Sequence, residues 1–213
     1  MSASSRRALI LIDVQNEYVT GNLPIEYPDV RLSLRNIARA AQAAVAAQIP
    51  IIVVQNSAPV TAPLFAKGTP GWALHPVVAG LPAAHSIEKS LPSAFTGTDL
   101  AAWLTGQDIG ILTVAGYMTH NCVDSTIKHA LHDGWQVEHL YDATGSVSYA
   151  NQVGTVSAEA IHRAFSVVLQ SRFAAVLTTD AWIEALTSGA PPQRDSIFAS
   201  NQRARLSLPP LGG

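Results

Sequence analysis

Cys122 is the only cysteine of this chain, and it lies where an apolar run gives way to a helical pattern. Residues 111–115 are typical of a buried strand, Gly116 favours a turn, and Thr119 is a suitable helix N-cap. A thiol in the first turn of a helix is close to unpaired backbone N–H groups and to the positive end of the helix dipole, and both favour the thiolate. Cys122 is therefore a candidate nucleophile, although a buried structural cysteine fits the position equally well.

Two charged residues also follow apolar runs. Asp13 comes directly after residues 8–12, where it fits either a general base or a carboxylate that caps the next turn. Lys89 follows a shorter run at residues 85–87 and stands beside Glu88. A lysine next to a glutamate is most often a solvated surface residue, so Lys89 acquires a catalytic interpretation only together with Asp13 and Cys122.

The order of the apolar runs predicts the elements that position these residues. Parallel strands are expected at residues 8–12, 51–54, 85–87, 109–115, 136–141 and 174–177. Helical stripes alternate with them, one of which consists of Val156, Ala160, Ala164, Val167 and Val168. The alternation predicts an α/β fold, a doubly wound parallel sheet with helices on both faces, in which ligands bind beyond the carboxyl ends of the strands.

The rest of the chain is organised around that sheet. Residues 1–190 are expected to form a single domain, and residues 191–213, rich in proline and glycine at their ends, a C-terminal arm or flexible tail. Residues 56–84 are a long segment rich in Pro, Gly and Ala, which fits a wall or lid over a pocket or a meandering surface connection.

Composition narrows the classes of function. The 213 residues carry a formal net charge of −2, with 48% hydrophobic and 13% charged residues, which gives no electrostatic footprint for nucleic acid. The apolar run at residues 8–12 is too short for a signal peptide, and no stretch has the length of a membrane span. A single cysteine excludes an intrachain disulfide. We therefore expect a soluble, cytoplasmic globular protein that binds neither nucleic acid nor membrane.

Three motifs together resemble a known family. Residues 11–18, 88–95 and 115–126 resemble, in the same order, the isochorismatase-like cysteine hydrolases, and the resemblance covers roughly residues 7–180. It implies a Rossmann-like three-layer sandwich with a six-stranded parallel sheet. By further resemblance to the family we expect a homo-oligomer, a dimer or a tetramer.

The resemblance also implies a catalytic triad of Asp13, Lys89 and Cys122. Cys122 would attack a substrate carbonyl, and Asp13 would take the thiol proton and pass it to the leaving amine. Water would then cleave the thioester, while Lys89 would favour the ionised carboxylate and thiolate. The alternatives from other classes are a non-catalytic partner-binding protein and a nucleotide binder, although no Gly-x-Gly-x-x-Gly motif follows Asp13.

The same resemblance places an oxyanion hole at the backbone N–H groups of Met118 and Cys122, and it implies a cis peptide bond between Tyr117 and Met118. A capping bond from Thr119 would occupy the Cys122 amide. We therefore predict that the Thr119 hydroxyl bonds elsewhere.

Other members of the family suggest what to expect of a metal site and of the substrate. Nicotinamidases bind a metal through an Asp-x-His pair, but residues 55–58 at the equivalent place hold neither residue type, so no metal and no cofactor are expected.

Residues 116–122 and 68–72 resemble the amide-hydrolysing branch that includes streptothricin hydrolases. We therefore expect cleavage of a C–N bond in a small-molecule amide, with an isochorismatase-type ether hydrolase as the alternative. Candidate substrate-binding residues near the strand ends are Gln15, Tyr18, Phe65, Trp72, Tyr117 and His120.

Overall fold

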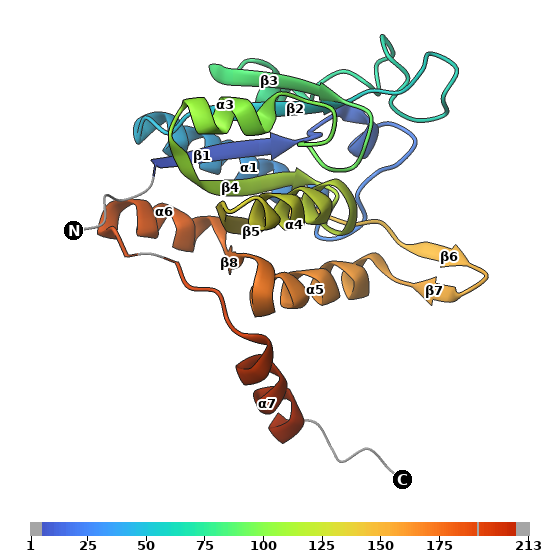
Figure 1. The fold of residues 1–213 in the computed structure, drawn as a ribbon. Helices are drawn as coiled ribbons and strands as arrows, with labels where there is room; N and C mark the ends of the chain where they lie inside the picture. The colour runs from blue at the N-terminus through green and yellow to red at the C-terminus, as the bar shows by residue number, and fades with distance from the viewer. Residues whose placement is uncertain (1–5, 191, 208–213) are drawn as a thin grey trace.

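A computed structural model describes residues 6–190 and 192–207, and its centre is a parallel sheet (Figure 1). The six strands lie in the order β3-β2-β1-β4-β5-β8 and all pair in parallel. Their bounds are Arg6–Ile12 for β1, Ile51–Asn56 for β2, Ala83–Lys89 for β3, Ile109–Tyr117 for β4, Gln136–Gly145 for β5 and Ala175–Leu177 for β8. The predicted α/β fold with a six-stranded parallel sheet is confirmed.

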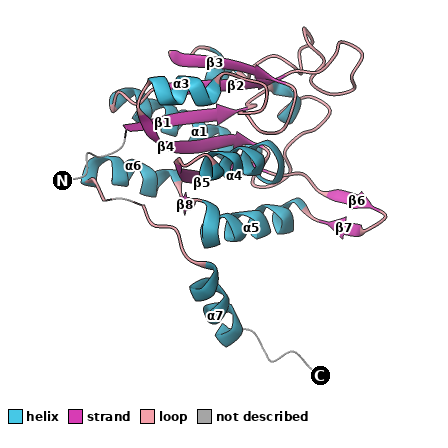
Figure 2. Cartoon of the chain, in the orientation of Figure 1, coloured by secondary structure: helices cyan, strands magenta, loops and turns pink. Residues whose placement is uncertain are grey.

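Helices cover both faces of the sheet (Figure 2). They are α1 (Val30–Ala46), α2 (Pro76–Ala79), α3 (Leu100–Gly106), α4 (Asp124–His132), α5 (Ala158–Val168), α6 (Thr179–Ser188) and α7 (Ile197–Ser207). One core contains Ile37 of α1 and Trp182 of α6, both fully buried, and the other contains Leu104 of α3 and Ile127 of α4. The sheet therefore separates two hydrophobic cores, which fix its carboxyl edge rigidly. Within the described residues, no helix is both long and apolar enough to cross a membrane.

Strand order reverses between β1 and β4, where chain segments leave the sheet in opposite directions. At this point Ile12 pairs with Gly116, whose φ is +106°. A Cβ atom on Gly116 would lie 2.1 Å from the carbonyl oxygen of Ile12, so only glycine allows the two backbones this approach. The close contact brings the segments that follow β1 and β4 side by side.

Several elements differ from expectation. A hairpin of β6 (Tyr149–Asn151) and β7 (Gly154–Val156) projects from the body, and the sequence analysis missed it because all its residues are exposed and show no apolar alternation. Helix α7 was also missed. It lies in the region expected to be an arm or flexible tail, of which residues 191 and 208–213 fall outside the described part.

The predicted stripe on α5 faces the wrong way. Ala160, Ala164, Val167 and Val168 are exposed, whereas Ile161 and its neighbours Ala158 and His162 form the buried face. The period of the pattern correctly located the helix, but periodicity does not tell which of two apolar faces packs on the core. This chain therefore carries an apolar helix face that its own fold leaves uncovered.

Candidate active site

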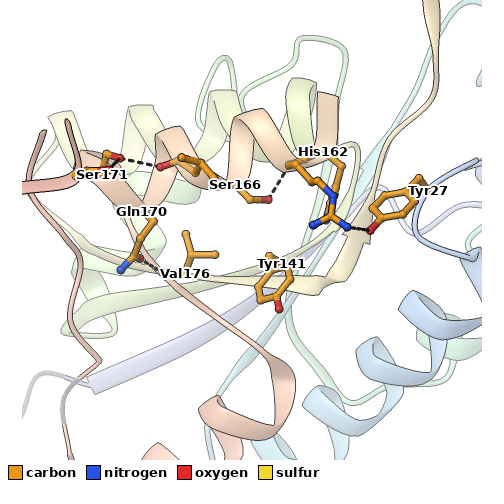
Figure 3. Close-up of a pocket in the computed structure, with 10 residues that line it drawn as sticks. Tyr27, Tyr141, His162, Ser166, Gln170, Ser171 and Val176 are labelled. Atoms are coloured by element: carbon orange, nitrogen blue, oxygen red, sulfur yellow. Dashed lines mark hydrogen bonds between the residues drawn. The ribbon is translucent and has the colours of Figure 1, made fainter. Parts of the chain in front are cut away.

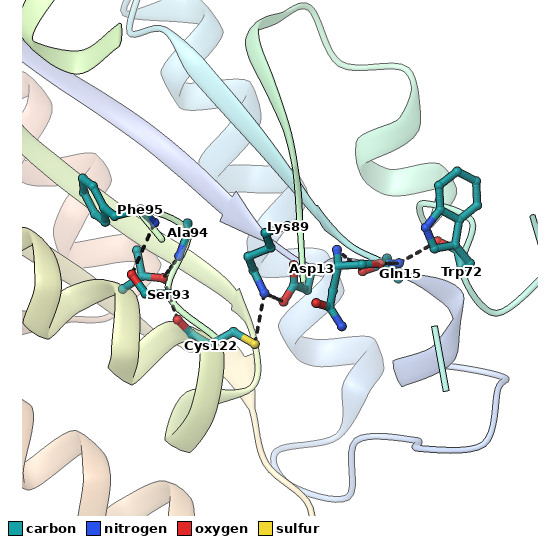
Figure 4. A network of polar contacts seen from close by, with 10 residues as sticks. Asp13, Gln15, Trp72, Lys89, Ser93, Ala94, Phe95 and Cys122 are labelled. Atoms are coloured by element: carbon teal, nitrogen blue, oxygen red, sulfur yellow. Dashed lines mark hydrogen bonds and ion pairs between the residues drawn. The ribbon is translucent and has the colours of Figure 1, made fainter. Parts of the chain in front are cut away.

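Asp13, Lys89 and Cys122 meet at the carboxyl edge of the sheet. The Lys89 Nζ atom lies 2.8 Å from Asp13 Oδ2 and 3.3 Å from Cys122 Sγ (Figure 4). Asp13 is 0% exposed, Lys89 4% and Cys122 5%. One ammonium group thus bridges a carboxylate and a thiol away from bulk water.

Local backbone geometry delivers each of the three side chains. Asp13 leaves β1 with φ of 51°, a left-handed conformation that Asp tolerates better than most residues, and its N–H donates to Val54 at 2.9 Å. Lys89 ends β3 in register with Asn56 of β2. Because side chains alternate along a strand, Glu88 points outward to Lys67 at 2.6 Å while Lys89 points inward.

Cys122 belongs to a π-helical turn, Thr119–Val123, that follows β4 directly. The N-cap of this turn is Met118, without a side-chain capping bond, so the expected cap at Thr119 is wrong. The Thr119 hydroxyl is buried and instead bonds with Thr144 Oγ1 at 3.1 Å and His162 Nδ1 at 2.9 Å. The prediction that this hydroxyl bonds away from the Cys122 amide is therefore confirmed.

Burial is the largest influence on the pKa of the Cys122 thiol. It raises the pKa of Cys122 to about 12, and the charge of Asp13 adds to this rise while Lys89 opposes it. The expectation that the start of a helix keeps Cys122 as a thiolate is thus wrong for the resting site. Desolvation and a neighbouring carboxylate outweigh the ammonium group.

The two charged partners respond to the same burial. It raises the pKa of Asp13 above its ordinary value, against the attraction of Lys89. For Lys89, burial lowers the pKa, but Asp13 and Cys122 together outweigh this effect and the net direction is upward. Lys89 is therefore an ammonium group at neutral pH, and Asp13 is a carboxyl group with an increased affinity for a proton.

Gln15 organises the wall of the site. Its amide Nε2 donates to the carbonyl oxygens of Asn56 at 2.9 Å and Trp72 at 2.6 Å, and its Oε1 accepts from the Asn56 N–H at 2.9 Å. The Trp72 indole donates to Ser57 Oγ at 2.7 Å. Gln15 and Trp72 thus tie the segment after β2 to the segment after β1, as Figure 4 shows.

Three predicted aromatic residues form one cluster. The Tyr18 ring lies 5.1 Å from that of Phe65 and 5.4 Å from that of Tyr117, measured between centroids. Burial raises the pKa of Tyr18, and the charges of Asp13 and Cys122 add to the rise, which places its hydroxyl beside the site. Tyr117 instead bonds with Ser33 Oγ at 2.7 Å, so its side chain points into the α1 core, and its peptide bond to Met118 is cis.

His120 lies at the mouth of the site with a partner that the sequence analysis missed. Its Nδ1 pairs with Ser146 Oγ and its Nε2 with the Tyr149 hydroxyl, both at 3.0 Å. Burial raises the pKa of Tyr149, and the charge of Cys122 adds to the rise. A tyrosine just after the fifth strand could have been found, because that strand ends at the same edge of the sheet.

In the part of the chain that the structure describes, no group of three or more His, Cys, Asp and Glu side chains could hold a metal ion. The site brings together a thiol, a carboxyl group and an ammonium group, a set that suits the chemistry of a carbonyl group.

Known proteins share both the sequence pattern and the fold. The Isochorismatase domain family matches residues 7–181. The chain belongs to the isochorismatase family. A crystal structure of an isochorismatase-type protein from Burkholderia xenovorans LB400 is 64% identical with a TM-score of 0.95, covering 96% of this chain and 99% of that one.

Two other similar proteins are more distant. A cysteine hydrolase from Pseudomonas syringae is 25% identical with a TM-score of 0.80, covering 89% of this chain and 100% of that one. An uncharacterised isochorismatase family protein from Bacillus subtilis is 30% identical over 83% of this chain and 98% of its own length. The resemblance to the family is confirmed, whereas the resemblance to streptothricin hydrolases stays a prediction.

The buried ion pair predicts a pH-dependent stability defect in Lys89→Met. We expect the free energy of unfolding to fall by roughly 3 kcal/mol at about pH 8, because Asp13 loses its counter-charge. Without Lys89, the pKa of Asp13 in the folded protein is raised, so protonation of Asp13 stabilises the folded state at low pH and this stabilisation is lost as pH rises. The loss of stability in Lys89→Met should therefore be smaller at about pH 5. Urea unfolding at the two pH values measures both effects.

The double variant Asp13→Asn/Lys89→Met is the control for that experiment, because it removes both charges. It should recover most of the lost stability. A Lys89→Met protein as stable as the wild type at both pH values would contradict the role of Lys89 as the counter-charge of Asp13.

Proposed function

We propose that this isochorismatase-family hydrolase cleaves the C–N bond of a small-molecule amide through a thioester on Cys122. The observation that carries the proposal is the contact of one buried ammonium group, Lys89 Nζ, with both a carboxylate and a thiol. A nucleophile, a base and a fixed charge are what acyl transfer requires. Vinyl-ether hydrolysis, the second candidate, needs an acid and has no use for the sulfur.

Charge balance defines the first step. The resting carboxylate, ammonium and thiol have a net charge of zero, and ionising the thiol into solvent would leave a buried net charge of −1. Transfer of the thiol proton from Cys122 to Asp13 keeps the sum at zero, because a neutral acid then stands beside an ammonium–thiolate pair. Asp13 is suited to accept this proton since burial has raised its pKa.

The later steps use the same groups. The thiolate forms a bond to the carbonyl carbon, and the carbonyl oxygen takes the negative charge, which the backbone N–H groups of Met118 and Cys122 would stabilise. The C–N bond then breaks as Asp13 returns the proton to the nitrogen, and the amine leaves. Asp13 next removes a proton from water, which attacks the thioester, and the carboxylic acid is released as the thiol re-forms.

Cys122→Ser tests the nucleophile. With a panel of small primary, secondary and cyclic amides, we expect ammonia or amine release by the wild type and a loss of roughly 10⁴-fold or more in the variant. Mass spectrometry of quenched wild-type reactions should show the acyl group on Cys122. Amide hydrolysis retained by Cys122→Ser would overturn the assignment, and thiol-independent cleavage of a vinyl ether would favour the second candidate.

The variant Asp13→Asn should change the thiolate content of Cys122 and the rate of amide hydrolysis in opposite directions. Because Asp13 raises the pKa of Cys122, the variant should contain more thiolate at a given alkaline pH, measured by ultraviolet absorbance of the thiolate. It should nevertheless hydrolyse amides about 10² to 10⁴ times more slowly, because it has no proton acceptor.

Asp108→Asn is the matched control for Asp13→Asn, since Asp108 is exposed and also has a left-handed φ, of 55°. It should change neither the thiolate content nor the rate. Faster turnover in Asp13→Asn would show that thiolate formation, and not proton transfer, limits the reaction.

We also propose that the protein is a homo-oligomer built on the uncovered face of α5. Val167 is 61% exposed and Val168 48%, and the small residues Ala160 and Ala164 beside them allow another helix to approach closely. A cavity of about 460 Å³ runs along this helix between Tyr27 and the segments of β8 and α7 (Figure 3). Helix α7 has no buried residue and leaves Phe198 75% exposed, as expected of an arm that packs on a second copy.

Ala164→Glu should weaken this association, because it places a charge in the centre of the proposed helix contact. We expect a lower mass by size-exclusion chromatography with light scattering at equal protein concentration, with an unchanged circular dichroism spectrum. A wild-type protein that is monomeric at high concentration would refute the oligomer.

A further inference from the structure

A cavity of about 510 Å³ lies beside His120, which belongs to the same turn as Cys122. Its walls come from the hairpin β6–β7 and from α5, and its lining includes Tyr149, Val153, Val156, Ile161, Phe165 and His120. We propose that this cavity is the subsite for an uncharged apolar or aromatic substituent of the amide substrate. The inference rests on the proposed amide hydrolysis, and it adds the chemical class of the group beside the scissile bond.

The cavity lies beside the turn that carries the proposed nucleophile. His120 lines the cavity and stands two residues before Cys122 on the same turn. The Tyr149 hydroxyl, also in the lining, bonds with His120 Nε2 at 3.0 Å. A substrate held by its carbonyl group at Cys122 therefore has this cavity as the adjacent space for its side group.

The lining of the cavity is mostly uncharged. Among the residues that the structure describes, no Asp, Glu, Lys or Arg lines it, and burial lowers the pKa of His120, which keeps its imidazole neutral at neutral pH. A charged substituent would lose water there without gaining a partner, which is costly. An aromatic ring would instead pack between aliphatic side chains and the ring of Phe165, and the volume is in the range of small-molecule sites.

The hairpin is attached to the body at its base. The structure describes β6 and β7 as exposed along their whole length, and a two-stranded hairpin alone is marginally stable. Its base is fixed by Ser148, which donates to Glu26 and accepts from the N–H of Ala158, and by the contact of Tyr149 with His120. The wall of the cavity is thus anchored next to the catalytic turn, while its tip is free to meet a ligand.

Ligand binding to a Cys122→Ala protein tests the subsite without turnover. We expect calorimetry to show at least about tenfold tighter binding of phenylacetamide or N-benzylacetamide than of acetamide. Phenylacetamide carries the ring on the acyl side, and N-benzylacetamide carries it on the amine side. The ligand that binds more tightly than acetamide therefore identifies the side of the amide that faces the hairpin. A phenylacetamide with a carboxylate on its ring should lose the gain.

Val156→Asp, introduced into the Cys122→Ala protein, should abolish the tighter binding of the ring-bearing amides, because it places a charge in the wall of the cavity. Val45→Asp on α1 is the matched control, since Val156 is 46% exposed and Val45 49%, and it should keep the gain. Phe165→Leu provides a second cavity variant that adds no charge, and it should reduce the gain.

Equal affinities for acetamide and both ring-bearing amides would overturn the subsite, whatever the thiol does. A Val156→Asp protein that still binds the ring-bearing amides more tightly would also overturn it. So would a Val156→Asp protein that loses this preference together with a changed association state in light scattering, because a second copy would then cover the cavity. Failure of the proposed function has a separate signature, because wild-type protein would then bind the aromatic amides without hydrolysing them.

Discussion

The site depends on keeping three ionisable groups neutral as a set inside a dry environment. Lys89 is the only group in the triad that carries positive charge, and its contacts with Asp13 and Cys122 make burial of the other two tolerable. The same burial that raises the pKa of Cys122 to about 12 also raises the proton affinity of Asp13. In the proposed mechanism, reactivity therefore comes from proton transfer between neighbours at constant charge, rather than from a stored thiolate.

That constraint explains why the fold must be rigid at one edge. Asp13 and Cys122 follow β1 and β4, the adjacent strands at which strand order reverses, and Gly116 allows their backbones to approach. Lys89 comes from β3, with β2 between it and β1, so a long side chain is needed to reach the pair. Two hydrophobic cores hold these strands in place, and their packing fixes distances on which the charge balance depends.

Sequence patterns were sufficient where one physical cause dominates. Continuous apolar runs located four of the six strands, β1, β2, β4 and β8, because strands buried on both faces leave that signature. The other two, β3 and β5, have mixed sequences and were expected from shorter or less regular patterns. Sequence patterns failed where two causes compete. The stripe containing Ala164 and Val168 has helical period but faces outward on α5, and the pKa of Cys122 follows desolvation instead of the helix end. Partners such as His162 for Thr119, distant in the sequence, leave no local signal at all.

In the proposed enzyme, the reacting groups and the substituent subsite occupy different parts of the molecule. Asp13, Lys89 and Cys122 lie at strand ends beside the two cores, whereas Tyr149 lies on an exposed hairpin that is anchored at its base. Substitutions in β6 and β7 can change the shape and polarity of the adjoining cavity at little cost in stability, because exposed positions contribute little packing. A fold arranged in this way can retain one reaction while its substrates diverge. The hairpin is thus where related enzymes with an equivalent triad are expected to differ most.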